Sequence, residues 1–281
     1  MKNFDFGVYG NILAVKQAHL FDIGCFLMRI YMYMGTLGVV SMLTLSGHSA
    51  FFSGTVSSTL AISTFFIAPR TGKFMDEKGQ HRVILITSII AMTGAILLLT
   101  TVALGLPSGI MYVAAFLMGF VPSAPAIART RWTYLIESGK LKNFSTSLKS
   151  VYSYEGVIED CSFMIGPALA IALSNTFFPT AGILLGCLSF TVGSFILLVL
   201  ARDTEPQVNW KRAAEGGEEA GSNADASADA ATSAKKHRSA LVELPIVRVL
   251  FSLALLVGLI FGAFDTTTIT FAQSIGQPVV A

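Results

Sequence analysis

The sequence predicts an all-α membrane protein in which seven apolar helices cross a lipid bilayer and the N-terminus is cytoplasmic. Three observations support this class. Apolar residues make up 53% of the 281 residues and charged residues only 13%, well below the roughly 25% charged residues of a water-soluble domain. The apolar residues form runs of about 20 residues, which is the length that crosses a bilayer as a helix. Lysine and arginine gather in alternate connections between these runs, as they do in cytoplasmic loops.

Seven apolar runs predict the spans, and they differ in their content of charged residues. The second, third, fourth and sixth contain none, whereas the first, fifth and seventh carry ionisable side chains. Because charge inside a bilayer is costly, functional groups are expected in those three. In order, the runs are Gly24–Gly47, Phe51–Pro69, Val83–Gly105, Gly109–Ala128, Val151–Ala172, Ala181–Ala201 and Val249–Ile269.

The basic residues predict which side of the membrane each connection occupies. Connections after the first, third and fifth runs lack lysine and arginine, whereas those after the second, fourth and sixth are rich in them. All of the 19 basic residues except Arg29 therefore lie on the side of the N-terminus, which we assign to the cytoplasm. Trp132 and Tyr134, at the end of the fourth run, predict an aromatic anchor at the membrane interface.

A change in composition divides the chain into three parts. Residues 1–201 hold six runs, and residues 245–281 hold the seventh. Between them, residues 202–244 include a stretch, 215–239, that has no aromatic or branched aliphatic residue. Such a segment buries too little apolar surface to offset the entropy of ordering, so we expect a disordered cytoplasmic loop.

Other classes of function lack their characteristic residues. The three cysteines lie singly in apolar runs, the four histidines are scattered, and no GxxxxGK[ST] motif occurs. We therefore expect no metal site, no cofactor, no nucleic-acid partner and no enzyme activity. The expected partners are the lipid bilayer, a small-molecule substrate and protons as the coupling ion.

The connection after the second run contains a recognisable motif. It resembles the signature G-x-L-a-D-[RK]-x-G-[RK]-[RK] that the major facilitator superfamily carries between its second and third helices. Glu77 and Gln80 depart from the usual basic residues. The matching residues that we single out are Gly72, Asp76, Gly79 and Arg82.

The resemblance implies a fold and a function. Family members are secondary transporters of twelve helices, so the chain is similar to a six-helix transporter half-bundle plus a seventh helix of an incomplete second half. It implies a permease that works by alternating access, with the motif as a conformational switch and Asp76 as its cytoplasmic latch. The segments Ala128–Trp132 and Tyr152–Glu155 also resemble a subgroup of bacterial efflux permeases, which favours proton-coupled export.

The fifth run resembles the G-P-x-x-G-G pattern of family antiporters in part. Small residues at spacings of four also predict close approach of a neighbouring helix, and this packing role is sufficient by itself. The residues of this helix-packing motif are Ser162, Gly166, Pro167 and Ala170.

Ionisable side chains within the runs are the candidate substrate and proton pathway. Glu155 and Glu159 share one face of the fifth run, and Asp160 lies about 100° away. A carboxyl that is neutral in one conformation and ionised in another would couple protons to transport; structural hydrogen bonds are the alternative. Arg29 is the candidate counter-charge, unless it snorkels to the cytoplasmic surface. Asp265, in the seventh run, is either a site residue or a local hydrogen-bonding group.

Two other readings compete with a transporter. The chain as given is either a working permease or a truncated, non-transporting remnant of one. A seven-helix receptor or retinal protein is less consistent with the sequence, because such receptors place the N-terminus outside. Since no lysine follows Lys236, the seventh run also lacks an amine for a retinal Schiff base. Pro122 and Pro125 interrupt the fourth run, as in helices that border transporter cavities, although a kink that only shapes the bundle is equally consistent.

Overall fold

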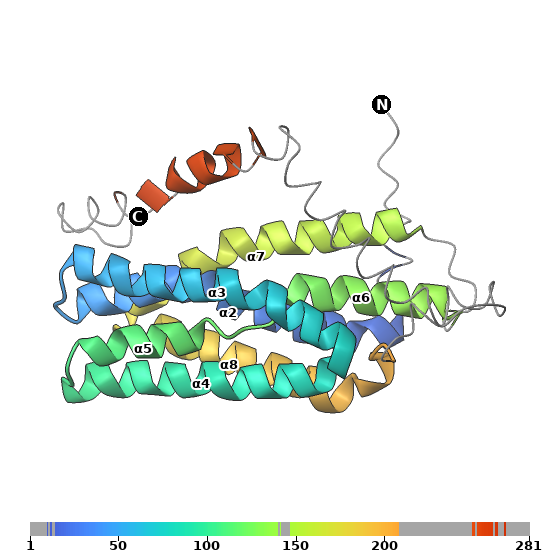
Figure 1. Ribbon diagram of the computed structural model, residues 1–281, viewed down its shortest axis with the longest axis horizontal. Helices are drawn as coiled ribbons and strands as arrows, with labels where there is room; N and C mark the ends of the chain where they lie inside the picture. The colour runs from blue at the N-terminus through green and yellow to red at the C-terminus, as the bar shows by residue number, and fades with distance from the viewer. Residues whose placement is uncertain are drawn as a thin grey trace, which may run out of the picture. The chain divides into compact units, whose positions relative to one another are not determined.

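In the residues that it describes, the computed structural model of the protein consists mainly of helices (Figure 1). It describes residues 10, 12, 15–139, 141, 147–207, 249–250, 252–260, 262–263 and 267. The chain divides into two compact units, Met1–Asn209 and Trp210–Ala281. Neither unit contains a strand within these described ranges.

The first unit is a bundle of antiparallel helices. Its long helices are α2 (Lys16–Leu45), α3 (Ala50–Lys78), α4 (Gln80–Leu104), α7 (Leu148–Thr176) and α8 (Ala181–Phe195). Two shorter helices, α5 (Gly109–Met118) and α6 (Ala124–Glu137), lie between α4 and α7 in the chain. After α8 the chain continues as a π-helical turn, η1 (Ile196–Leu200), and a 3₁₀ turn, η2 (Arg202–Thr204).

Five of these segments are long and apolar enough to cross a membrane, as expected for an all-α membrane protein. They are α2, α3, α4, α7 and the continuous segment Ala181–Leu200. The predicted fourth span is split instead into α5 and α6, because residues 119–123 are not helical. The two prolines do interrupt this span as expected: Pro122 lies in the break and Pro125 in the first turn of α6.

The second unit is described only in part. Residues 249–250, 252–260 and 262–263 are helical, within the predicted seventh span. Asp265 lies outside the described residues, as does most of the predicted central loop. The first few residues assigned to that loop, 202–207, belong to the first unit, and Thr204 and Pro206 are buried there.

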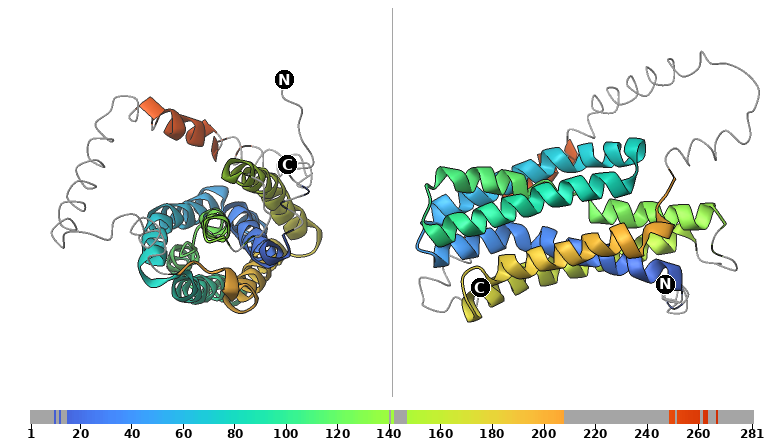
Figure 2. Two further views of the ribbon diagram at one scale, coloured as in Figure 1. Left: turned by 90° about the vertical axis from the view of Figure 1, so that its right-hand side faces the viewer. Right: turned by 90° about the horizontal axis from the view of Figure 1, so that it is seen from below.

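The centre of the bundle is α2, which packs against α3, α6, α7 and α8. Figure 2 shows the helices of this unit end-on and from below. Small residues permit the closest approaches. A Cβ added at Gly166 of α7 would lie 2.8 Å from Tyr33 Cβ, and one at Gly182 of α8 would lie 2.5 Å from the Ala170 carbonyl oxygen. Ser162 and Ala170, from the same motif, are buried as well.

Serine side chains define where several helices begin. Ser49, Ser123 and Ser147 each accept a hydrogen bond from the backbone N–H three residues later, which satisfies one of the free donors of the first helical turn. Two further boundaries are glycines with positive φ, Gly79 (86°) and Gly105 (62°).

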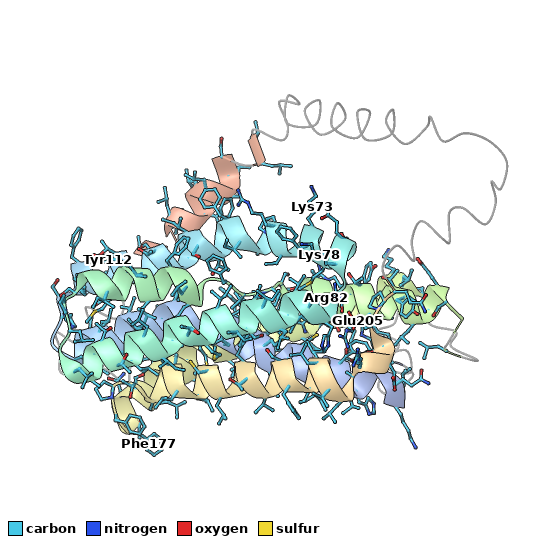
Figure 3. All side chains as sticks on the ribbon, turned by 60° about the horizontal axis from the view of Figure 1, so that its bottom comes forward. Lys73, Lys78, Arg82, Tyr112, Phe177 and Glu205 are labelled. Carbon is cyan, nitrogen blue, oxygen red and sulfur yellow. The ribbon has the colours of Figure 1, made fainter. Side chains whose placement is uncertain are left out.

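Positively charged residues gather at one end of the bundle, which we call the basic end. There α2, α4 and α7 begin and α3 and α6 end. Figure 3 shows Lys73, Lys78, Arg82 and Glu205 at this end and Tyr112 and Phe177 at the opposite end. The connections at the opposite end, residues 46–49, 105–108 and 177–180, contain no lysine or arginine.

The connection predicted between the second and third spans is not a loop. Helix α3 continues through Gly72 and Asp76 to Lys78, and Gly79 alone separates it from α4. The apolar run ends before the helix does, because hydropathy reports contact with lipid and not helicity. Arg82 lies in the first turn of α4 and is exposed.

Candidate functional site

Ionisable side chains of α2, α6 and α7 form two ion pairs, one buried and one partly exposed. The first joins Arg29 of α2 to Glu155 of α7 through Nη2 and Oε2. Each side chain is only 1% exposed. Arg29 therefore does not snorkel, and it forms the counter-charge that the sequence predicted for the fifth span.

The buried pair is incompletely hydrogen-bonded. Arg29 Nε and Glu155 Oε1 are both buried and form no hydrogen bond with any residue that the structure describes. Buried polar atoms of this kind are uncommon and usually have a functional or structural reason.

A third ionisable group, Asp22, lies beside the pair. It precedes Arg29 by two turns of α2, and it interacts electrostatically with both Glu155 and Arg29. Trp132 Nε1 of α6 donates a hydrogen bond of 3.0 Å to Asp22 Oδ1. Two carboxyl groups and one guanidinium are thus gathered where α2, α6 and α7 meet.

Trp132 does not form the predicted aromatic anchor at the membrane interface. Its side chain is fully buried, and its ring packs edge-to-face on Phe21, with 5.5 Å between ring centroids. The prediction was wrong because the indole satisfies its N–H inside the bundle, on Asp22, and so has no need of the interface.

The second ion pair joins Arg129 of α6 to Glu159 of α7 at 3.0 Å. Unlike the first pair, it is accessible: the side chains are 44% and 30% exposed. Tyr33 of α2 donates a hydrogen bond of 3.1 Å to the other carboxylate oxygen of Glu159. Nearby on the same two helices, Thr133 and Tyr152 are joined by a hydrogen bond of 2.7 Å.

The predicted pathway residues therefore have different positions. Glu155 and Glu159 lie one turn apart on α7, yet the first is buried and the second is partly exposed. Asp160 is exposed and takes part in neither ion pair. The structure thus places three of the predicted residues, Arg29, Glu155 and Glu159, in two ion pairs that link α2, α6 and α7.

The basic end holds a further buried network around Arg131 of α6. Its Nε donates to Gln80 Oε1 at 2.9 Å, and its Nη1 donates to the Ala201 carbonyl at 2.6 Å and to Thr204 Oγ1 at 3.0 Å. Gln80 gives the buried guanidinium an uncharged acceptor, whereas a basic side chain at this position would repel Arg131.

The same network contains the beginning of α4. The backbone N–H of His81 donates a hydrogen bond of 2.7 Å to Glu205 Oε1, from the segment after η2. A carboxylate at a helix N-terminus is favourable because it meets free N–H groups and the positive end of the helix dipole. Of the switch-motif residues, Gly79 is buried in this region, whereas Asp76 is exposed on the last turn of α3.

Sequence reasoning missed four members of the site: Tyr33, Arg129, Arg131 and Trp132. Hydropathy places the two arginines in a loop, because they follow an apolar run. The spacing of residues in this segment is the signal that indicates otherwise. Arg129, Trp132 and Thr133 recur at the three- and four-residue intervals of one helical face, which suggests that the helix continues.

Comparisons of the chain with protein families, with characterised proteins and with solved structures find no match.

Proposed function

We propose that this chain is a secondary transporter of the major facilitator type, which exports a small molecule in exchange for protons by alternating access. In this proposal the basic end faces the cytoplasm, as the distribution of lysine and arginine favours. The main support for the proposal is the two ion pairs that link α2, α6 and α7, because α2 and α7 are long and apolar enough to span a membrane.

The depth of these groups supports the proposal. Glu159 is the twelfth residue of α7, about 16 Å along the helix axis from its first residue, so it lies near the middle of a bilayer that α7 would cross. Ionisable residues at such depth are costly, and in membrane proteins they usually mark a pathway for substrates or ions.

The accessible pair is suited to substrate. Arg129 and Glu159 are partly exposed, and pairs of this kind contribute only about 0–1 kcal/mol. A charged substrate can therefore replace one partner at little cost. Tyr33 and Tyr152 add aromatic surface with hydroxyl groups beside it. The broken fourth span, between α5 and α6, precedes Arg129 in the chain, and broken helices are a feature of transporters.

The switch motif has a role in the proposed cycle. Gly79 is the single hinge residue between α3 and α4, and Asp76, exposed beside it, is available as a latch for a facing helix. Rearrangement there would move α3 and α4 relative to the remainder of the bundle.

Transport into everted membrane vesicles tests the proposal. We choose ethidium as the first probe, because Glu159 and Asp160 outnumber Arg129 at the accessible surface; carboxyfluorescein and a neutral fluorescent sugar serve as comparison solutes. We expect at least one probe to enter the vesicles only when their interior is more acidic than the medium. A protonophore should abolish this uptake. Glu159→Gln should reduce this uptake at least about tenfold, which corresponds to the free energy lost with one hydrogen bond to a charged group.

Asp203→Asn is the control variant, because Asp203 is an exposed carboxylate away from both ion pairs. It should transport as the parent does. Uptake that is identical with and without a gradient for all three probes would contradict the proposal, and unchanged uptake in Glu159→Gln would remove this residue from the pathway.

A further inference from the structure

Helix α7 has a wide exposed surface that carries a carboxylate. Ser153 and Asp160 lie two turns apart on the same exposed side of this helix. Asp160 forms no ion pair with any residue that the structure describes. The buried part of α7 is one narrow stripe, which consists of Val151, Glu155, Ser162, Gly166, Ala170 and Ser174.

The depth of Asp160 makes lipid a poor neighbour for this side of α7. Asp160 is the thirteenth residue of α7, about 18 Å along the helix axis from its first residue. An ionised carboxylate near the middle of a bilayer is costly unless it meets protein or water. By contrast, the rest of α4 beyond Arg82 and the whole segment Ala181–Leu200 contain no charged residue. Their exposed sides suit lipid, whereas the exposed side of α7 suits a partner that supplies a positive charge.

We infer that two copies of this chain associate through this side of α7 and the adjoining edge of α6. We call this surface the polar face and define it by Arg129, Ser153 and Asp160, which are all exposed. The two copies lie parallel, because an antiparallel pair would place the two basic ends on opposite sides of the membrane. The inference rests on the proposed function for the position of the polar face within a bilayer.

The charges of the polar face are complementary to those of a second copy. Arg129 lies 3.0 Å from Glu159, and Asp160 is the next residue along α7, so Arg129 and Asp160 have nearly the same depth. A two-fold axis along the membrane normal leaves depth unchanged. Arg129 of each copy can therefore meet Asp160 of the other, which gives two equivalent contacts. A guanidinium has five N–H donors, so Arg129 can contact Asp160 and keep its contact with Glu159.

A second copy also completes the candidate substrate site. In one copy, Arg129, Glu159 and Tyr152 are all at least partly exposed, so a charged substrate held beside them would meet lipid. With a second polar face opposite, the same residues lie between two protein walls, as ligand sites between the helices of bundles do.

Counting the chains in each vesicle tests this association. The full chain, with a fluorescent protein fused to its N-terminus, is reconstituted into liposomes at a dilution that leaves most vesicles empty. Photobleaching should then show two steps in most occupied vesicles. Arg129→Asp places two acidic groups opposite each other at each contact, and Asp160→Arg places two arginines there. Because like charges repel, either variant alone should reduce the two-step fraction at least about tenfold.

Mixing the two variants is the matched control. When one copy carries Arg129→Asp and the other carries Asp160→Arg, both contacts again join an arginine to an aspartate. Chains of the two variants, labelled in two colours, should therefore share a vesicle about as often as parent chains do, which also shows that both variants fold. Glu159→Gln removes the internal ion pair without changing the polar face, and it should leave the two-step fraction unchanged.

Crosslinking locates the contact. In a background with Cys25, Cys161 and Cys187 replaced, Ser153→Cys should form a crosslinked dimer with a short bismaleimide in native membranes. Ile86→Cys is the control, because Ile86 is exposed on α4 at a similar distance from the basic end. It should remain monomeric.

Single photobleaching steps from the parent chain would overturn the inference and leave the polar face to another part of the same chain or to lipid. Two steps that persist in either variant alone, mixed variants that stay apart, or equal crosslinking of Ser153→Cys and Ile86→Cys would overturn it as well. Because neither measurement needs transport, dimers without gradient-driven uptake would keep the interface and reject the transporter. Gradient-driven uptake by chains that stay single would do the reverse.

Discussion

Arg29 and Glu155 lose hydration when the bundle forms, at a cost of several kcal/mol for each charge. Their mutual attraction offsets that cost only while both are present. The two residues are contributed by α2 and α7, 126 positions apart, so the pair also specifies how these helices face each other. The effect of removing one partner should therefore differ from the effect of removing both.

Arg29→Met should destabilise the protein by about 3–5 kcal/mol, because it leaves the buried Glu155 carboxylate unpaired. The double variant Arg29→Met/Glu155→Met should recover most of this loss, since two apolar side chains of similar volume replace the pair. The free energy of unfolding, measured by circular dichroism in mixed micelles of increasing dodecyl sulfate content, checks both values.

Arg129→Met is the comparison for this series. Its pair with Glu159 is partly exposed, so the change should cost no more than about 1 kcal/mol. If the double variant were as unstable as Arg29→Met alone, the ion pair would not be the cause of the loss.

The residues of the buried pair could be predicted, whereas their neighbours could not. Charge within an apolar run is visible in a sequence, and this identified Arg29 and Glu155. The roles of Trp132 and Arg129 depend on the rotation of α6 about its axis, which is set by contacts with α2 and α7 and not by hydropathy. The missed hydrogen bond between Trp132 and Asp22 is of this kind.

At the scale of elements, the boundary between α3 and α4 depends on one residue. Gly79 has φ 86° and ψ 155°, a combination that is almost restricted to glycine. Gly79→Ala should destabilise the protein by about 1–3 kcal/mol. Gly72→Ala, in the same motif but inside α3 with no atom within 4 Å of the added Cβ, should be neutral or stabilising by up to about 1 kcal/mol.

Thermal unfolding in detergent measures the two variants side by side, followed by the fluorescence of a thiol-reactive dye on the buried Cys25, with Cys161 and Cys187 replaced. Equal midpoints for Gly72→Ala and Gly79→Ala would show that the motif glycines are not distinguished by backbone conformation.

The contact between α2 and α7 depends on the absence of a side chain at Gly166. Gly166→Ala would bring the new methyl group to 2.8 Å from Tyr33 Cβ, so the helices must separate, at about 1–3 kcal/mol. Gly54→Ala, in α3 with nothing within 4 Å, is the control and should not destabilise. Because Tyr33 also donates to Glu159, only Gly166→Ala should weaken gradient-driven uptake; an equal effect of both would argue against a specific contact.

Sequence patterns predicted the existence of these elements better than their ends. Each of the first six apolar runs contains helix, but α3 and α6 continue well beyond their runs, to Lys78 and Glu137. A hydropathy window detects the part of a helix that contacts lipid. The polar side chains of the helical turns at the basic end form hydrogen bonds with other helices or with water. These turns therefore resemble loops in composition.

At the scale of the whole molecule, the asymmetric charge distribution predicts its orientation. The bundle has lysine and arginine at one end, and the described connections at the other end have none. Since cytoplasmic segments retain basic residues, the basic end should face the cytoplasm. In the proposed transport cycle, this assignment would decide from which side protons and substrate reach the two ion pairs.

Single cysteines at the two ends test this orientation. Lys73 and Phe177 are both well exposed, with 79% of the Lys73 side chain and 70% of Phe177 accessible, and they lie at opposite ends (Figure 3). In a background with Cys25, Cys161 and Cys187 replaced, Lys73→Cys should react with a membrane-impermeant maleimide only in everted vesicles. Phe177→Cys should react only in intact cells. The reverse pattern would place the basic end outside, and labelling of both sites from one side would show that the antiparallel bundle does not span the bilayer.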